Sequence, residues 1–277
     1  MKLGTFMGQL NSAIKLNEAE SLSAVFDTFI PMGLSYVDIS SEDTRSQGEP
    51  TVLAEILKEK GVSVASLFHL FAFDNIGKAE IESLKEMTER QLELCGLFDT
   101  KLYMPVPVVN FPHKDTPAFL DARKRFAEYL HNAVIQGKAY GVQTVIENFS
   151  DRKNPNASVE DIAYLLQEVP DLKYVLDCGN FWFGGDNVLS ATDLFMEKII
   201  HVHLKDLVET PTGRLDICGR RGESVPIGEG EIPTKAILEK LQASGYRGGL
   251  TVEINHNENM MVEIASSLNN IKAMLAV

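Results

Sequence analysis

Residues 199–206 read Ile-Ile-His-Val-His-Leu-Lys-Asp, and the rest of the chain can be understood from this stretch outward. Successive side chains of an extended strand point to opposite faces. His201, His203 and Lys205 would therefore share one face, and aliphatic side chains would occupy the other. This pattern suits a barrel strand, whose aliphatic face packs under helices while its polar face lines the interior. Buried polar groups need partners, so the pattern indicates a site rather than plain packing.

On both sides of this stretch, short apolar runs alternate with longer amphipathic runs. The short runs predict strands at Leu3–Met7, Leu34–Ser40, Val62–Phe68, Lys101–Val106, Val142–Phe149, Leu172–Asp177, Ile199–Lys205 and Gly249–Ile254. The longer runs predict helices near Glu18–Met32, Pro50–Lys60, Lys78–Leu97, Pro117–Tyr140, Val159–Glu168, Leu189–Glu197, Thr234–Ala243 and Met260–Leu275. Gly61 and Gly141 stand where helices should end.

Strict alternation of strand and helix predicts a parallel sheet with crossover helices, and eight such pairs close into a barrel. The expected fold is therefore α/β, a single (β/α)8 TIM barrel formed by residues 1–277. An open doubly wound sheet would need a glycine-rich phosphate loop after an early strand. The sequence contains neither GxGxxG nor a P-loop motif.

The net charge of the chain argues against some classes of binding partner. Lys and Arg number 26 against 39 Asp and Glu, which gives a formal net charge of −13 at pH 7. Such a field repels nucleic acid and anionic membranes, so neither is expected as a partner. A phosphate-bearing ligand would need a local cluster of cations.

Cysteine use and hydropathy indicate the compartment. Cys95, Cys178 and Cys218 are widely spaced and form no CxxC motif, so a reducing cytoplasm is expected. The N-terminal residues resemble a first strand rather than a secretory signal. No apolar run reaches the roughly 18 residues that a membrane span requires.

Acidic residues and a histidine recur where the later strands should end. Glu147, Asp177, His203 and Glu253 occupy these positions on four successive predicted strands. In a barrel of this type the residues that carry chemistry lie at the carboxyl ends of strands. Three converging carboxylates would repel one another and raise their pKa values. A divalent metal relieves that conflict, with oxygen ligands and one imidazole in its shell.

These motifs resemble the xylose-isomerase-like barrels, a family of sugar-phosphate isomerases and epimerases that also includes the type IV apurinic endonucleases. The resemblance spans essentially the whole chain and is strongest over residues 142–254. Its motifs are Glu147, Asp177-Cys178-Gly179-Asn180, His203-Leu204-Lys205-Asp206, Pro226-Ile227-Gly228-Glu229-Gly230 and Glu253. It implies that Glu147, Asp177, His203 and Glu253 hold one divalent ion, which in the family is manganese, cobalt, magnesium or zinc.

The chain departs from the epimerases that act on free ketoses at two positions. Asn180 stands where those enzymes have a substrate-binding histidine, and Glu209 stands where they have an arginine. The D-x-G-N and H-x-K-D forms are more similar to the pentulose-5-phosphate 3-epimerases. These two departures leave the identity of the substrate undetermined, but they do not affect the expected metal site.

The residues and the resemblance both indicate proton transfer beside a carbonyl of a small carbohydrate, a ketose or ketose phosphate. The metal would stabilise an enediolate, while Glu147 and Glu253 exchange protons with the substrate. Return of the proton to the same carbon is epimerisation, and return to its neighbour is isomerisation. The sequence does not separate the two.

Further residues are candidates for substrate contacts. His69, Asn180 and Lys205 could bind substrate, and Lys205 with Asp206 could instead be an ion pair or orient His203. Residues 207–232 predict an ordered lid or binding loop, in which Arg220 and Arg221 are candidates for a phosphate contact. His201 is interpreted as a buried structural residue. A homo-oligomer, dimer or tetramer, is possible, with no interface recognisable in the sequence.

Three alternatives remain. A dehydratase acting on inosose or dehydroshikimate would use the same barrel and metal. A type IV endonuclease would need extra histidines, and the loop at 207–232 has none. A non-catalytic sugar-binding barrel would not need the four metal-type residues.

Overall fold

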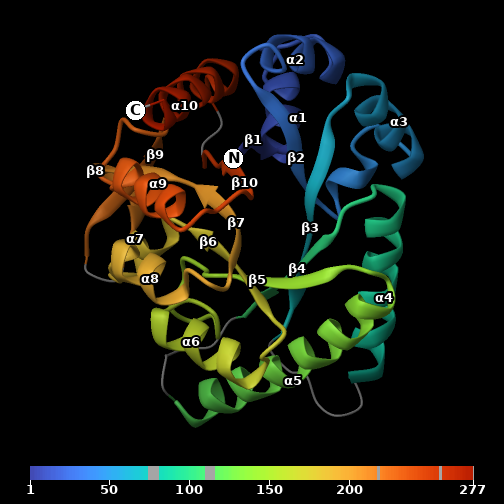
Figure 1. Cartoon of the computed structure of the whole chain (residues 1–277), viewed down its shortest axis with the longest axis vertical. Coiled ribbons are helices and arrows are strands. Elements are labelled where there is room, and N and C mark those ends of the chain that lie inside the picture. Colours follow the sequence, from blue (N-terminus) through green and yellow to red (C-terminus); the bar gives the residue numbers. More distant parts are fainter. Residues whose placement is uncertain (74–80, 110–115, 217–218, 256–257, 277) are drawn as a thin grey trace.

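The computed structural model describes residues 1–73, 81–109, 116–216, 219–255 and 258–276. Eight parallel strands close into a barrel in the order β1-β10-β7-β6-β5-β4-β3-β2 (Figure 1). They are β1 (Lys2–Phe6), β2 (Leu34–Ser40), β3 (Ser63–Ala72), β4 (Leu102–Val108), β5 (Gln143–Glu147), β6 (Lys173–Asp177), β7 (Ile199–Leu204) and β10 (Gly249–Val252). The predicted (β/α)8 TIM barrel is confirmed.

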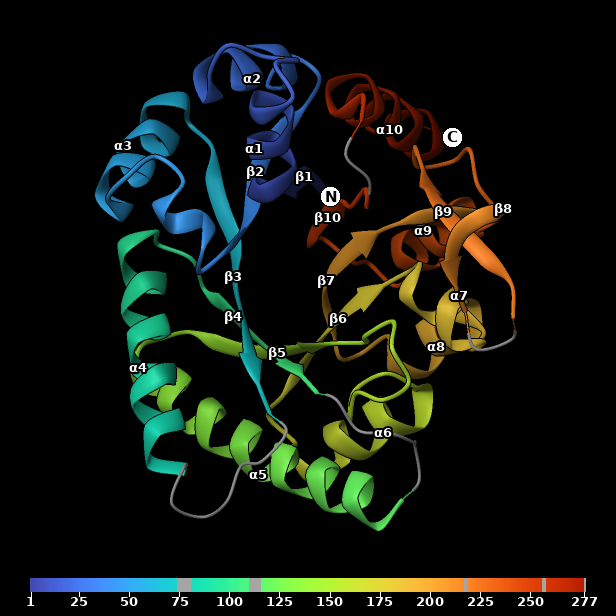
Figure 2. The ribbon, with the colours of Figure 1, turned by 180° about the vertical axis from the view of Figure 1, so that it is seen from behind.

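Helices surround the barrel and cover the outer face of its strands (Figure 2). They are α1 (Met7–Lys15), α2 (Leu22–Phe29), α3 (Pro50–Lys60), α4 (Ile81–Leu97), α5 (Pro117–Ala139), α6 (Val159–Glu168), α7 (Asn180–Gly184), α8 (Val188–Phe195), α9 (Thr234–Ala243) and α10 (Met260–Leu275), with a short 3-10 turn at Asp43–Arg45. No helix in the described part of the chain has the length and apolar character needed to cross a bilayer.

Local sequence signals explain where several helices begin and end. Ser158 and Asp161 form a capping box at the start of α6, in which each side chain bonds the backbone N–H of the other. Thr116 accepts a hydrogen bond from the Phe119 N–H at the start of α5. Gly61 ends α3 in the left-handed conformation, with φ of 67°, which glycine adopts without steric cost.

The core has two parts. The larger lies between the barrel and the helices and takes the outward side chains of the strands. The smaller fills the barrel interior, where Met104, Val106, Val145 and Val175 pack together. Inward and outward side chains alternate along each strand, so the polar residues of β7 face the interior as predicted.

Four features differ from the sequence expectation. Helix α1 directly follows β1, and the expected helix Glu18–Met32 is the shorter α2. Strand β3 continues to Ala72, four residues beyond its predicted end. Helix α7 follows β6 directly. The start of the helix expected at Lys78 lies outside the described residues, which include 81–109. Short helices at strand ends have too few turns to show a periodic pattern.

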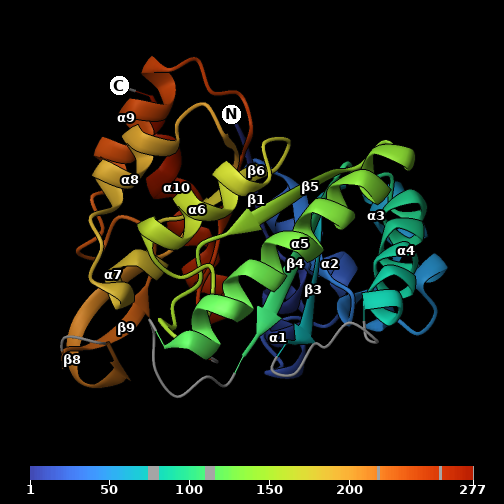
Figure 3. The same ribbon diagram turned by 90° about the horizontal axis from the view of Figure 1, so that it is seen from below.

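The predicted ordered loop after β7 is a hairpin followed by a tight turn. Strands β8 (Asp206–Leu215) and β9 (Arg221–Val225) pair antiparallel outside the barrel, beside α7 (Figure 3). The buried carboxylate of Asp206 accepts hydrogen bonds from the backbone N–H groups of four residues. They are Leu207, Gly228, Gly230 and Ile232, at 2.8–3.1 Å. This one side chain therefore fixes the turn against the barrel.

Two of the three cysteines lie among the described residues. Cys95 and Cys178 are buried free thiols, and burial raises the pKa of Cys178 well above its usual value. Cys218 lies outside the described residues.

Candidate metal centre

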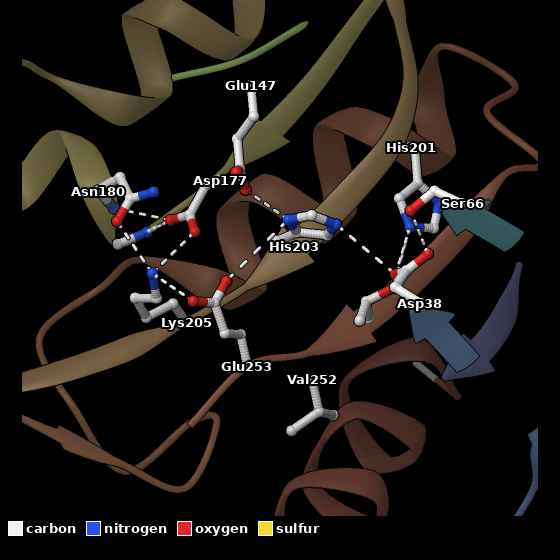
Figure 4. Close-up of polar contacts among 12 residues, drawn as sticks. Asp38, Ser66, Glu147, Asp177, Asn180, His201, His203, Lys205, Val252 and Glu253 are labelled. Carbon is white, nitrogen blue, oxygen red and sulfur yellow. Dashed lines mark hydrogen bonds and ion pairs between the residues drawn. The ribbon is translucent and has the colours of Figure 1, made fainter. Parts of the chain in front are cut away.

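The structure brings the four predicted ligands together at one end of the barrel (Figure 4). Glu147 ends β5, Asp177 ends β6, His203 lies in β7 and Glu253 follows β10. In the barrel these strands are consecutive neighbours, and the register places Asp177 opposite His203. One ligand atom from each of the four lies within 4.8 Å of all the others. Residues that are more than 100 positions apart in sequence thus form one cluster.

The donor set of this cluster fits a divalent cation. The Nδ1 atom of His203 contacts Glu147 Oε1 and lies 4.0 Å from Glu253 Oε2. The buried Oδ2 of Asp177 accepts no hydrogen bond from the described residues and has an ionic contact with Lys205. Three carboxylates and one imidazole are ligands that manganese, cobalt, magnesium and zinc sites use to differing degrees. These residues could therefore hold such an ion, with His203 binding through Nδ1.

Lys205 is the cation of the cluster and is itself buried. Its ammonium group lies 3.0 Å from Asp177 Oδ2 and 2.7 Å from Glu253 Oε1, and it donates to Asn180 Oδ1 at 2.9 Å. Three carboxylates carry three negative charges and Lys205 one positive charge. A divalent ion beside a neutral His203 would therefore leave the cluster neutral, which favours its binding in a poorly solvated site.

The electrostatics of the cluster shift the pKa values of two candidate ligands, Glu253 and His203. Burial raises the pKa of Glu253 to about 7; Lys205 opposes the shift, whereas the nearby carboxylates Asp177 and Glu147 add to it. Burial alone would lower the pKa of His203, but Glu147 and Asp38 raise it well above its usual value. Negative charge thus causes the rise for His203 and adds to the effect of burial for Glu253, and a bound cation would offset that charge.

A second buried network lies behind His203 and was missed from the sequence. The fully buried carboxylate of Asp38, on β2, is 2.8 Å from His201 Nε2. It accepts hydrogen bonds from Thr251 Oγ1 at 2.5 Å and from Ser66 Oγ at 2.6 Å. Against the cost of burial, its neighbouring histidines lower the pKa of Asp38. His201 is buried at 1% exposure, in keeping with the structural role expected of it.

Asp38 also lies next to the ring nitrogen of His203 that faces away from the cluster carboxylates. Its Oδ2 lies 3.6 Å from His203 Nε2, which has no hydrogen-bond partner among the described residues. In the neutral form of His203 that a bound cation requires, this negative charge favours the proton on Nε2 and leaves the Nδ1 lone pair for the ion. Carboxylates behind ligating histidines act in this way in many metal sites.

We expect Asp38→Asn to weaken divalent-ion binding about 10-fold, because the substitution removes the charge that fixes the His203 tautomer while keeping the side-chain shape. Competition with a fluorescent chelator would measure the affinity. Asp43→Asn is the matched control, since Asp43 bonds Ser40 and Asn11 and none of its side-chain hydrogen bonds to the described residues involves the cluster. Equal losses in the two variants would contradict the role of Asp38.

A pocket of about 370 Å³ opens onto the cluster. Its apolar wall comes from Phe6, Phe68, Leu70, Met104, Val106, Phe149 and Ile254, and its polar lining from Gln9, Asp43, Glu147, Ser150, Asn180, Lys205, Arg214, Glu253 and Asn255. The ring of Phe6 meets the His203 ring edge-on at 4.8 Å. A mixed lining of this size suits a small polar molecule that also has an apolar face.

The predicted substrate contacts divide into two groups. Two of the predicted contact residues, Asn180 and Lys205, line this pocket. The ammonium group of Lys205 pairs with Asp177 and Glu253 rather than with Asp206. His69 is not among the described residues that line it. Its neighbours Phe68 and Leu70 face the pocket, so His69 points to the opposite face of β3, where its ring stacks on Phe71.

Arg220 and Arg221 are also absent from the described lining of the pocket. Arg220 pairs with Asp216 at 2.8 Å and lies 4.1 Å above the Trp182 ring. Arg221 donates to the Gly213 carbonyl. The hairpin residue that does reach the pocket is Arg214, which sequence reasoning did not select as a site residue.

The "Xylose isomerase-like TIM barrel" family matches residues 31–273. An inosose isomerase of Halalkalibacterium halodurans is 24% identical, covering 87% of this chain and 85% of that protein. An inosose dehydratase of Geobacillus thermodenitrificans is 27% identical (73% and 72% covered). A putative L-ribulose-5-phosphate 3-epimerase of Escherichia coli is 25% identical (80% and 79%).

Among solved structures, the IolI protein with a bound zinc atom superposes with a TM-score of 0.78. The two chains are 20% identical, and the match covers 100% of this chain and 98% of that one. At this identity the likeness concerns the fold. It extends over the whole barrel, including the strands that carry the cluster.

Proposed function

The chain belongs to the xylose isomerase-like TIM barrel family, and on that premise we propose that it is a divalent-metal-dependent isomerase or epimerase of a ketose or ketose phosphate. The relatives are named as sugar or cyclitol isomerases, epimerases and dehydratases, so the chain belongs among enzymes that act on such compounds. The finer assignment rests on the geometry of the cluster.

One observation carries the proposal. The side chains of Asp177 and His203 have no exposed surface, whereas those of Glu147 and Glu253 are 11% and 18% exposed. Of the four, the two glutamates alone are among the described residues lining the pocket. The cluster therefore contains two buried ligands and two carboxylates that can also reach a substrate. That division of roles is what proton transfer between two bases requires.

The residues of the chain fit the chemistry of enolisation. A divalent ion held by the cluster would supply a Lewis acid for the substrate carbonyl, making the neighbouring C–H acidic. One glutamate would then remove this proton to give the enediolate, and the other would return one. Lys205 positions Glu253 through its 2.7 Å contact. Phe6 and Phe68, packed edge to face, limit access of water to the reacting carbon.

A dehydratase on the same barrel is the second candidate. Dehydration shares the enolisation step and then expels a hydroxyl, which needs a proton donor in the pocket. Lys205 stays protonated at neutral pH, since neighbouring carboxylates outweigh its burial and raise its pKa, so it would assist the leaving hydroxyl by donating a hydrogen bond. One relative carries the name inosose dehydratase.

Deuterated buffer tests the proposal. Ketoses, ketose phosphates and inosose would be incubated with the enzyme, with and without added Mn²⁺, and analysed by mass spectrometry. We expect metal-dependent gain of deuterium at the carbon next to the carbonyl, with a product of unchanged mass otherwise. Loss of water with an ultraviolet-absorbing enone would identify the dehydratase instead. Absence of exchange with every ketone in the panel would refute both.

A further inference from the structure

We propose that Arg214, with Ser150, forms a subsite for the phosphate monoester of the substrate at the rim of the pocket. This inference rests on the proposed function and names its substrate class, a ketose phosphate. The proposed phosphate contact is Arg214 rather than Arg220 or Arg221, the residues expected from the sequence. Those two arginines have partners elsewhere in the hairpin.

Arg214 is the cation that remains available in the pocket. Two cations, Lys205 and Arg214, are among the described residues lining it. The ammonium group of Lys205 already contacts Asp177, Glu253 and Asn180. Among the described residues, Arg214 makes no ion pair with a carboxylate and donates one hydrogen bond, from Nη1 to Ser150 Oγ at 2.8 Å. A negatively charged substituent entering the pocket would therefore be met by Arg214.

The guanidinium group of Arg214 is held in a defined plane. Its central carbon lies 4.7 Å above the Phe183 ring, so one face is covered by an aromatic side chain. Ser150 holds one of the five N–H groups and itself lines the pocket. The other N–H groups form a fork suited to two phosphate oxygens, and the Ser150 hydroxyl could donate to a third.

The pocket lining carries a negative charge at Asp43 and a positive charge at Arg214, and this difference would orient a charged substrate. Asp43 and Gln9, from the segment after β2 and from α1, line the same pocket as Arg214 and Ser150. A phosphate would avoid Asp43, leaving that region to the hydroxyl groups of the sugar. Beyond Arg214, an adjoining pocket is lined by Glu223 and Glu258. This acidic boundary favours one terminal phosphate over a longer diphosphate chain.

The neighbouring Arg220 provides a matched control on the same hairpin. It also stacks on an aromatic ring, but its guanidinium group is already paired with Asp216 at 2.8 Å. The two variants Arg214→Gln and Arg220→Gln thus remove one positive charge each. They differ in whether that charge faces the pocket.

Calorimetric titration of the metal-containing enzyme with ribulose and with ribulose 5-phosphate tests the subsite. We expect the phosphate ester to bind the unmodified enzyme about 10- to 100-fold more tightly than the free sugar. Arg214→Gln should remove this preference and leave binding of ribulose within about twofold, while Arg220→Gln keeps the preference. Added inorganic phosphate should shift the Arg214 side-chain N–H resonance, identified by its loss in the Gln variant.

Three binding results would each overturn the subsite: equal loss of affinity for both ligands in Arg214→Gln, equal loss of the preference in Arg220→Gln, or no preference in the unmodified enzyme. An Arg214 resonance that does not respond to inorganic phosphate would also overturn it. The binding measurements are independent of catalysis. If the proposed enolisation failed, deuterium exchange would be absent with both ligands, whereas failure of the subsite alone would leave exchange in free ketoses intact.

Discussion

Replacement of either pocket glutamate, as Glu147→Gln or Glu253→Gln, is expected to abolish deuterium exchange into the substrate, with a loss of about 10²- to 10⁴-fold. The amide keeps the size of the side chain but cannot accept a proton. Each glutamate is also a candidate ligand of the metal, so the loss has two possible causes. Mass spectrometry of the exchanged ketone, together with the metal content of each variant, separates them.

Asp177→Asn is the control for ligand loss. Asp177 belongs to the same cluster but is fully buried and is not among the described pocket residues. Its replacement should weaken metal binding, and saturating Mn²⁺ should restore part of the exchange. Saturating metal should not restore either Gln variant. If Glu147→Gln or Glu253→Gln regained exchange under these conditions, that glutamate would be a ligand only, and the two-base mechanism would fail.

The fold and the ligand cluster could be read from the sequence because both follow from local patterns. Strand periodicity and helix ends are encoded within about ten residues, and the closed barrel follows from eight alternations. The carboxyl ends of parallel strands then meet at one edge. Glu147, Asp177, His203 and Glu253 therefore had to converge once the barrel closed. None of these steps required knowledge of a distant contact.

The residues that escaped prediction depend on long-range packing or on strand register. Asp38 lies in an ordinary strand pattern and contacts His201, 163 positions away. His69 was expected beyond the end of its strand, but β3 continues to Ala72. That continuation keeps the alternation of faces and turns His69 away from the pocket.

The arginines of the hairpin show the same limit. Pairing of β8 with β9 shifts register between Glu209 and Arg214, so Arg214 lies opposite Gly222. A shift of this kind decides which side chains face the barrel mouth, and sequence alone does not set it. The sequence pointed to the adjacent pair Arg220 and Arg221, whereas the folded hairpin brings Arg214 to the pocket.

Lys205→Met is expected to lower the free energy of unfolding of the metal-free protein by about 3–5 kcal/mol. The substitution keeps the length and apolar stem of the side chain but removes the positive charge between Asp177 and Glu253, leaving buried carboxylates uncompensated. A divalent ion replaces that charge, so saturating Mn²⁺ should restore much of the stability. Chemical denaturation with and without the ion would measure both effects.

The pH dependence of this loss has a defined sign. Lys205 lowers the pKa of Glu253, which other effects raise to about 7, so its removal raises that pKa further. A carboxyl whose pKa is higher in the folded state is stabilising when protonated, and this stability is lost as pH rises toward the folded pKa. On the metal-free protein, the deficit of Lys205→Met should therefore grow as the pH rises above about 7, where Glu253 is ionised in the unmodified protein but still protonated in the variant.

Lys240→Met controls for removal of a lysine charge in general. Lys240 pairs with Asp193 at 2.6 Å on the surface, where Asp193 is 60% exposed, and such pairs contribute about 0–1 kcal/mol. A loss in Lys205→Met no larger than in Lys240→Met would show that the buried carboxylates need no cation. A large loss that Mn²⁺ leaves unchanged would show that the ion does not share their charge. Either outcome would remove the electrostatic basis for a metal at this cluster, because its excess negative charge is what the ion is proposed to balance.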